Sequence, residues 1–238
     1  MSKTVKIRKG ANIKLVGSAE KTTSDTTLPS SFALKPADFH GMVPKLLLKE
    51  GAEVKAGTPI FYSKSNERIK FVSPVSGEIA EVVRGAKRKI LEVRIVADSE
   101  QKSEIAAPVD FSSFDRAKMA DALLDAGLWP FIKRRPYDII ADPTEAPKSI
   151  FVSGFDSAPL GADLNYILEG READFQMGID GLSKLTEGKV HLNIQSGSGS
   201  FMANAKNAQV NTFTGPHPAG LPGIQIHHID PVNKGEVV

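Results

Sequence analysis

The chain has 238 residues, with 30 basic and 28 acidic side chains, 41% hydrophobic residues and no cysteine. The lack of cysteine excludes a disulfide framework, a thiolate zinc site, a cysteine-ligated iron–sulfur cluster and a cysteine nucleophile. The formal net charge of +2 is too balanced to favour nucleic-acid binding, which needs a strongly basic face. No run approaches the roughly 20 apolar residues of a membrane-spanning helix, and the chain starts without an apolar signal-peptide core. We therefore expect a soluble, cytoplasmic protein.

The first hundred residues show the alternation typical of β-structure. Residues 5–8 and 12–16 alternate apolar and polar side chains around a glycine, which predicts a short hairpin. Residues 17–31 are almost wholly polar and predict a loop. Further apolar runs between turn signals continue to about residue 96. This part of the chain is therefore predicted to form a β domain over residues 1–100.

The second part of the chain alternates predicted helices with predicted strands. The polar residues 97–109 form a plausible linker. Residues 115–126 and 163–185 carry apolar side chains at helical spacing. Buried strands are predicted at residues 149–153, 190–194 and 210–213. This alternation indicates a Rossmann-like α/β domain with a mostly parallel sheet over residues 101–238.

Residues 50–60 and 73–79 resemble the two halves of a biotinyl/lipoyl-type β barrel-sandwich. In carrier domains of that type, a lysine at a hairpin tip receives the prosthetic group. Here Asn66 stands at the corresponding position, and an amide cannot be acylated because the chemistry needs a nucleophilic amine. Lys64 and Lys70 are near but out of register. We therefore expect a sandwich scaffold without the modifiable lysine.

Two further patterns are weak candidates for ligand sites. The Gly-x-Gly segment at residues 197–199 follows a predicted strand, but Met202 stands where the dinucleotide fingerprint needs its third glycine. We interpret this segment as a surface loop. His217, His227 and His228 lack a completing ligand pattern, and adjacent histidines on a strand point to opposite faces. We therefore expect structural histidines and no metal site.

Two basic clusters also stand out. Residues 84–89 lie on a predicted hairpin and form either a solvated face or a docking surface for anionic lipid or an acidic partner. Residues 133–135 follow Trp129 and Phe131 and precede Tyr137. Flat rings beside guanidinium donors would suit an aromatic carbonyl compound such as a quinone.

Several short motifs occur in order along the chain, at residues 6–10, 71–77, 84–88, 127–129, 135–136, 150–153 and 215–221. Together they resemble the A-subunit family of the bacterial sodium-translocating NADH:quinone oxidoreductase. The resemblance covers essentially the whole chain. Members of that family are considerably longer, so we expect that a C-terminal part of the full-length protein is missing here.

The resemblance implies a peripheral subunit on the cytoplasmic side of the bacterial inner membrane. The complex passes electrons from NADH to quinone and pumps sodium. NADH, FAD, FMN and an iron–sulfur cluster would be held by partner subunits, and the membrane subunits, especially the flavin-carrying B subunit, would be the partners. This chain would bind no cofactor or metal, would contain no catalytic residue, and would be inactive in isolation.

The resemblance also assigns quinone contacts to residues 34–42 and 131–138. Within and beside these stretches, the candidate quinone-binding residues are Phe39, Gly41, Met42, Trp129, Phe131, Arg135, Pro136 and Tyr137. Ile132 and Lys133 depart from the family pattern, and Arg134 is an additional cation. The residues Gly215, Pro216, His217, Pro218 and Gly220 form a structural motif of the family.

Three alternatives remain open at the level of sequence. The chain could be a purely structural docking module of the complex. It could be the flavin- and NADH-binding C subunit of the related ferredoxin:NAD oxidoreductase, although that relative carries cysteine-ligated clusters. It could also be an independent dinucleotide-binding enzyme that uses Gly197 and Gly199. We expect the isolated chain not to bind NADH, and NADH binding would support this alternative.

Overall fold

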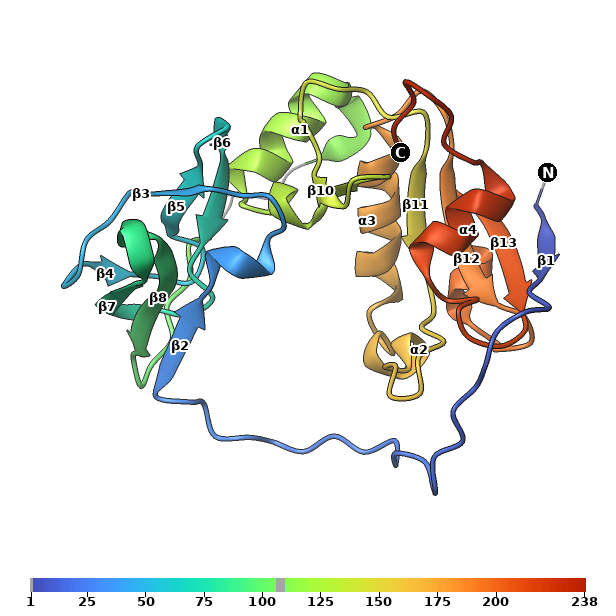
Figure 1. Cartoon of the computed structure of the whole chain (residues 1–238), viewed down its shortest axis with the longest axis horizontal. Coiled ribbons are helices and arrows are strands. Elements are labelled where there is room, and N and C mark those ends of the chain that lie inside the picture. The colour runs from blue at the N-terminus through green and yellow to red at the C-terminus, as the bar shows by residue number, and fades with distance from the viewer. Residues whose placement is uncertain (1, 106–109) are drawn as a thin grey trace. The chain divides into compact units, whose positions relative to one another are not determined.

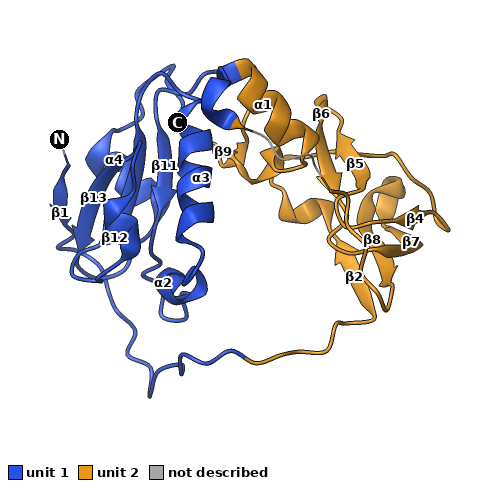
Figure 2. Ribbon diagram, turned by 180° about the vertical axis from the view of Figure 1, so that it is seen from behind, with its two compact units in different colours: residues 1–23, 111–116, 146–238 blue, residues 24–110, 117–145 orange. Residues whose placement is uncertain are grey.

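The computed structural model describes residues 2–105 and 110–238 (Figure 1). The end of the predicted linker, residues 106–109, lies outside the described residues. The chain forms two compact units, each assembled from separate stretches of sequence (Figure 2). Unit 1 contains Met1–Thr23, Phe111–Arg116 and Ala146–Val238, and unit 2 contains Ser24–Asp110 and Ala117–Glu145. The packing therefore divides the chain differently from a single boundary near residue 100.

Unit 2 contains a β-sandwich of two antiparallel sheets. One sheet has the strand order β2 (Ser31–Leu34), β8 (Ile90–Ala97), β7 (Gly77–Arg84) and β4 (Glu53–Val54). The other has the order β3 (Pro44–Leu46), β5 (Pro59–Ser63) and β6 (Asn66–Val72). Period-two alternation buries one face of each strand, as with Ile79, Val93 and Ile95. The sandwich predicted from the sequence is therefore present.

The hairpin tip of the sandwich differs from the sequence-based expectation. The two-residue turn between β5 and β6 consists of Lys64 and Ser65, and Asn66 is already the first residue of β6, paired with Ser63. The expectation that Asn66 occupies the tip is therefore wrong. The spacing of short motifs misplaced the turn because it takes no account of the register shift beside Ser63.

Unit 2 also contains the predicted helix, α1 (Arg116–Asp125), except for its first residue. Gly127, with φ of +69°, ends this helix in a Schellman motif. The Gly127 amide donates to the Leu124 carbonyl, and the Leu128 amide donates to the Leu123 carbonyl. The 3₁₀ turn η4 (Trp129–Phe131) and a small hairpin of β9 (Lys133–Arg134) and β10 (Ile139–Ile140) follow.

Unit 1 is built on a fully parallel sheet with the strand order β1-β13-β12-β11. Its strands are β1 (Thr4–Lys6), β11 (Ile150–Ser153), β12 (Val190–Gln195) and β13 (Gln209–Thr214). The accompanying helical segments are α2 (Leu164–Ile167), α3 (Glu172–Ser183), η5 (Phe201–Asn204) and α4 (Pro222–Ile229). The predicted strands β11, β12 and β13 are confirmed.

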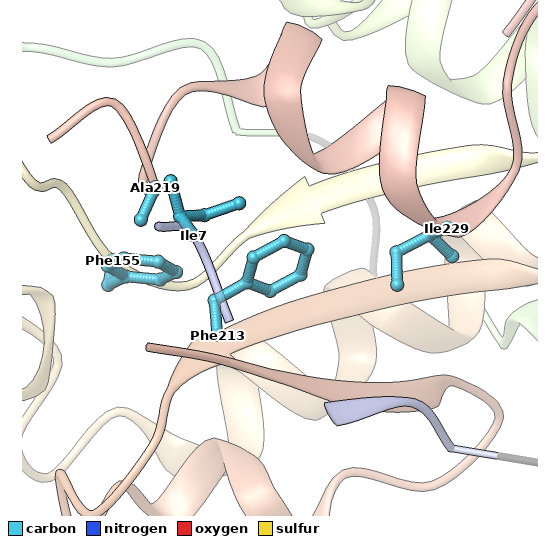
Figure 3. Close-up of a cluster of buried hydrophobic side chains, with 5 residues drawn as sticks. All are labelled: Ile7, Phe155, Phe213, Ala219 and Ile229. Carbon is cyan, nitrogen blue, oxygen red and sulfur yellow. The ribbon is translucent and has the colours of Figure 1, made fainter. Parts of the chain in front are cut away.

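Both faces of this parallel sheet are covered, as is usual for α/β domains. On one face, Phe213 of β13 packs with Ile229 of α4 and with three residues from outside the helices and strands, Ile7, Phe155 and Ala219 (Figure 3). On the other face, Leu192 and Ile194 of β12 pack with Met202 and with residues from α2 and α3, including Phe175. The two-sided burial is clearest in β12, where five of the six residues are buried, the polar His191 and Asn193 among them.

Two other local predictions for unit 1 are wrong. Residues 5–8 and 12–16 do not form a hairpin, because β1 instead pairs in parallel with β13, and the segment after it is tied to the 214–220 loop. The predicted helix over residues 163–185 is divided into α2 and α3 around Gly170, whose φ is +77°.

Candidate functional site

A tight turn in unit 2 carries the first group of candidate residues. The 3₁₀ turn η1 (Pro36–Asp38) ends at Phe39, whose amide donates to the Pro36 carbonyl. Gly41, with φ of +74°, reverses the chain, and the Met42 amide donates to the Phe39 carbonyl over 3.2 Å. A residue with a Cβ would be strained at this φ. The turn therefore fixes the direction in which the Phe39 side chain points from the backbone.

The second group of candidates lies on the β9–β10 hairpin, which is attached to the sandwich through Trp129. The Trp129 side chain is 3% exposed, and its Nε1 donates to the Ala141 carbonyl over 2.8 Å. The Ala141 amide in turn donates to the Ile132 carbonyl. Turn η4 packs on β6, where Gly127 lies close to Val72. Trp129 thus supports the base of the hairpin and faces neither solvent nor an open cleft.

The structure brings the two groups of candidates together. The rings of Phe39 and Phe131 meet edge to face, with centroids 6.3 Å apart. A Cβ on Gly41 would lie 3.3 Å from Cγ2 of Ile139 in β10. Residues 36–42 and the hairpin at 129–141 are therefore neighbours within unit 2, although about 90 residues separate them in the sequence.

The aromatic contacts continue from the surface into the sandwich core. Phe39 packs edge to face on Phe71, with centroids 4.5 Å apart, and Phe71 stacks on Phe61. Phe61 and Phe71 are buried, whereas Phe131 is 71% exposed and Tyr137 is 63% exposed. We call Phe39, Leu128, Phe131 and Tyr137 together the aromatic surface; Leu128, Phe131 and Tyr137 are exposed, and the half-buried Phe39 is in ring contact with Phe131. Large exposed apolar side chains are typical of ligand or partner sites.

Each cation of the hairpin is ion-paired. Asp138 Oδ1 forms ion pairs with Arg135, whose Nη2 lies 3.3 Å away, and with the Lys133 ammonium group, 3.6 Å away. Arg134 pairs with Glu145 at 3.0 Å, and its guanidinium carbon lies 5.5 Å from the centroid of the Tyr137 ring. These partly exposed pairs contribute little to stability. They orient the guanidinium groups, each of which carries five N–H donors.

Of the eight sequence-predicted quinone residues, Phe39, Gly41 and Met42 lie in the turn, and Arg135, Pro136 and Tyr137 lie in the loop between β9 and β10. Trp129 and Phe131 belong to η4, directly before the hairpin, with Trp129 buried and Phe131 exposed. Pro136 follows Arg135 through a cis peptide bond in the hairpin loop. Sequence reasoning missed Leu128, which is exposed, and Val72, on which the hairpin base is seated. The only available signal for Leu128 was an apolar residue directly after the glycine that ends α1.

The 214–220 loop holds the start of the chain in unit 1. A Cβ on Gly215, whose φ is +115°, would lie 2.1 Å from the Ile7 carbonyl oxygen. The Ala11 amide donates to the His217 carbonyl over 3.0 Å, and the His217 amide donates to Asn12 Oδ1. The His217 ring contacts Ser157 Oγ through Nδ1 at 3.0 Å. Pro216, Pro218 and Gly220 belong to the same loop.

The Gly-x-Gly segment does not form a dinucleotide site of the Rossmann type. After β12 the chain enters the short 3₁₀ turn η5, so no α-helix N-terminus faces a pyrophosphate there. Met202 is buried in the core beneath this turn. His227 and His228 lie on α4, so the expectation that they lie on a strand is wrong.

The described part of the chain contains neither a metal-ligand cluster nor a membrane-spanning helix. Within residues 2–105 and 110–238, no group of three or more histidine or acidic side chains is arranged to hold a metal ion. Across the same described residues, no helix is both long enough and apolar enough to span a membrane.

Comparison with known families matches both parts of the chain. Residues 5–98 match the NqrA N-terminal barrel-sandwich hybrid domain, and residues 114–238 match the NqrA second alpha/beta domain. The chain belongs to the NqrA family. The predicted resemblance and the predicted combination of a barrel-sandwich with an α/β domain are therefore confirmed.

Curated relatives agree with this assignment. Over 236 residues, 98% of this chain, it is 34% identical to the A subunit of the Na(+)-translocating NADH-quinone reductase of Saccharophagus degradans. It is 35% identical to the corresponding protein of Neisseria meningitidis serogroup A over the same length. In both cases the match covers 53% of the relative. The chain thus spans about half the length of the curated NqrA proteins it matches.

Proposed function

We propose that this chain is part of the peripheral A subunit of a sodium-pumping NADH:quinone reductase and that its aromatic surface contributes to quinone binding. The contact between Phe39 and Phe131 carries this proposal, because it joins two distant stretches to which the family resemblance assigns quinone contacts. The relatives named above, which belong to an NADH-quinone reductase, support the choice of ligand.

The chemistry of the site suits a flat ligand with carbonyl groups. Phe131 and Tyr137 expose ring faces and edges against which a quinone ring can pack. Arg135 is held beside them by Asp138 and can donate a hydrogen bond to a quinone oxygen. NADH, FAD, FMN and the iron–sulfur cluster would reside on partner subunits. The flavin-carrying B subunit and the other membrane subunits would complete the site on the cytoplasmic side of the inner membrane.

The experiment uses the assembled complex carrying Phe131→Ala or Tyr137→Ala in this chain. We expect the KM for a short-chain quinone to rise about tenfold, which corresponds to about 1.4 kcal/mol of binding free energy. Labelling of the hairpin by a photoreactive quinone should fall in parallel. Leu160→Ala, which changes a still more exposed apolar residue of unit 1, is the control and should leave both quantities unchanged.

A second candidate function is that of a purely structural docking module. Exposed aromatic residues are also enriched in protein–protein interfaces, so the same observation favours it. In that case Phe131→Ala would reduce the yield of assembled complex, and the complex that does assemble would keep its KM and its labelling. That combination would refute quinone binding at this surface. The C-subunit alternative loses its support, because both matching domain families are those of NqrA.

A further inference from the structure

A strongly basic hairpin tip projects from the sandwich, and the proposed quinone site does not use it. Residues 84–89, which we call the basic hairpin tip, connect β7 to β8. Arg84, Lys87, Arg88 and Lys89 are all exposed. Lys87 and Arg88 both have left-handed φ values, of 55° and 60°, and the Arg84 guanidinium donates to the Arg88 carbonyl. The tip is thus a defined turn that presents four cations to solvent.

These four positive charges are not neutralised by neighbouring acids. No acidic residue occurs between Arg84 and Leu91. The nearest acids along the two strands, Glu81 and Glu92, both pair with Arg94, at 2.8 and 2.9 Å. Among the residues that the structure describes, none forms an ion pair with a cation of the tip. The tip therefore carries a concentrated positive potential that is available to an anionic partner.

Apolar side chains surround the same cations. An open groove of about 570 Å³ is lined by Leu46, Leu47, Leu48, Lys49, Glu50, Val82 and Arg84. The Glu50 carboxylate in this groove accepts from the Val82 amide over 2.7 Å and is the one acid of the lining, against the two cations Lys49 and Arg84. Leu47 is 47% exposed, and Leu91, which packs over Gly85 in the tip, is 41% exposed. Leucines and cations thus share one edge of the sandwich.

We propose that the basic hairpin tip and the adjoining leucines dock unit 2 onto an anionic phospholipid membrane. The four cations would contact lipid phosphates, and Leu47 and Leu91 would enter the boundary between headgroups and acyl chains. Polybasic segments with adjacent apolar residues bind anionic membranes in this way. Protein interfaces also bury leucines, so an acidic protein is the alternative partner; we favour the membrane because clustered cations beside exposed leucines are the combination that binds anionic lipid.

The test is co-sedimentation of the full chain with vesicles of phosphatidylglycerol and phosphatidylcholine, compared with vesicles of phosphatidylcholine alone. Each basic residue near such a surface contributes about 1 kcal/mol, roughly a fivefold change in binding. The variant R84Q/K87Q/R88Q/K89Q should therefore bind the mixed vesicles at least about tenfold more weakly. Raising the salt from about 0.1 to 0.5 M should release the wild-type chain.

The matched control is R8Q/K9Q/K206Q/K234Q, which removes four exposed cations of unit 1 and gives the same net charge. If the charges of the tip, and not the net charge of the chain, cause the binding, this control should bind the mixed vesicles within about twofold of the wild type. The double variant L47Q/L91Q should bind more weakly while keeping all four cations. Circular dichroism verifies that each variant is folded.

Four outcomes would overturn the proposal. They are equal binding of the wild type to neutral and mixed vesicles, equal loss in the control variant, full binding by the leucine variant, and absence of vesicle binding by the wild type. If the wild type does not bind vesicles but the tip variant no longer joins the assembled complex, an acidic protein partner replaces the lipid. The tip contains no residue of the aromatic surface, so this proposal and the quinone proposal can fail separately.

Discussion

The seating of the β9–β10 hairpin on the sandwich can be tested by adding a single methyl group at Gly127. Gly127→Ala introduces a Cβ that would lie 2.4 Å from Cγ1 of Val72, at a φ of +69°. Carbon atoms in contact normally lie about 3.5–4.0 Å apart, so the backbone or Val72 must move. Because Trp129 follows two residues later, we expect the displacement to reach the base of the hairpin.

The magnitude has two separable contributions. A left-handed conformation costs a non-glycine residue roughly 1–2 kcal/mol, and overpacking a filled site costs about 1–3 kcal/mol. Gly127→Ala should therefore lower the free energy of unfolding of unit 2 by roughly 2–5 kcal/mol. Val72→Ala alone should cost about 1 kcal/mol for its lost methyl groups. In the double variant the clash is gone, while the backbone strain and the loss of the Val72 methyl groups remain.

The assay is urea unfolding followed by tryptophan fluorescence. Trp129 is the only tryptophan in the chain and is buried in unit 2, so its emission reports this unit alone. The double variant should be no less stable than Gly127→Ala, which gives a coupling energy of about 1–3 kcal/mol between the two positions. Strictly additive losses, or a Gly127→Ala chain as stable as the wild type, would refute the proposed seating.

Two further predictions concern unit 1. Gly215→Ala should release the start of the chain, because its Cβ would lie 2.1 Å from the Ile7 carbonyl oxygen, and hydrogen exchange should rise in residues 4–12 while α3 stays protected. His191 is 5% exposed, and its Nδ1 has no hydrogen-bond partner among the described residues. Burial lowers the pKa of His191, against the opposing influence of Asp230. The unfolded chain therefore takes up a proton below the ordinary pKa of 6.5 more readily than the folded chain, and stability falls as the pH drops through that value. His191→Leu should reduce the loss of stability between about pH 7.5 and 5.5, measured by urea unfolding with circular dichroism; an unchanged loss would exclude His191 as its source.

The sequence predicted those helices and strands whose own residues show an apolar pattern that marks the buried face. The strand β11 carries an apolar run, and β12 and β13 carry apolar residues at alternate or nearby positions that are buried in the two cores. The helix α1 was predicted because its apolar face and its terminal Gly127 are both local signals. The pairing of β1 with β13 was not predictable in this way, because strand alternation does not specify a partner about 200 residues away.

The candidate site was only partly predictable for the same reason. The resemblance indicated residues 34–42 and 131–138, but their meeting depends on η4 packing against β6, which no local pattern records. The sequence predicted that Trp129 lies near the site. It did not predict that this residue is buried with its Nε1 donating to the Ala141 carbonyl. The buried amides of Asn193 and Asn211 were also missed, because polar residues are usually exposed and these two bond to each other in the centre of the sheet.

The position of β1 at the edge of the parallel sheet has a consequence for biosynthesis. Thr4–Lys6 are synthesised some two hundred residues before their partner, Gln209–Thr214. The strands of the sandwich all lie between residues 31 and 97, so they can fold while the α/β sheet is still incomplete. The β1 segment therefore has to stay unpaired until translation has passed residue 214. Pairing of β1 with another strand before that point is the specific misfolding risk of this topology.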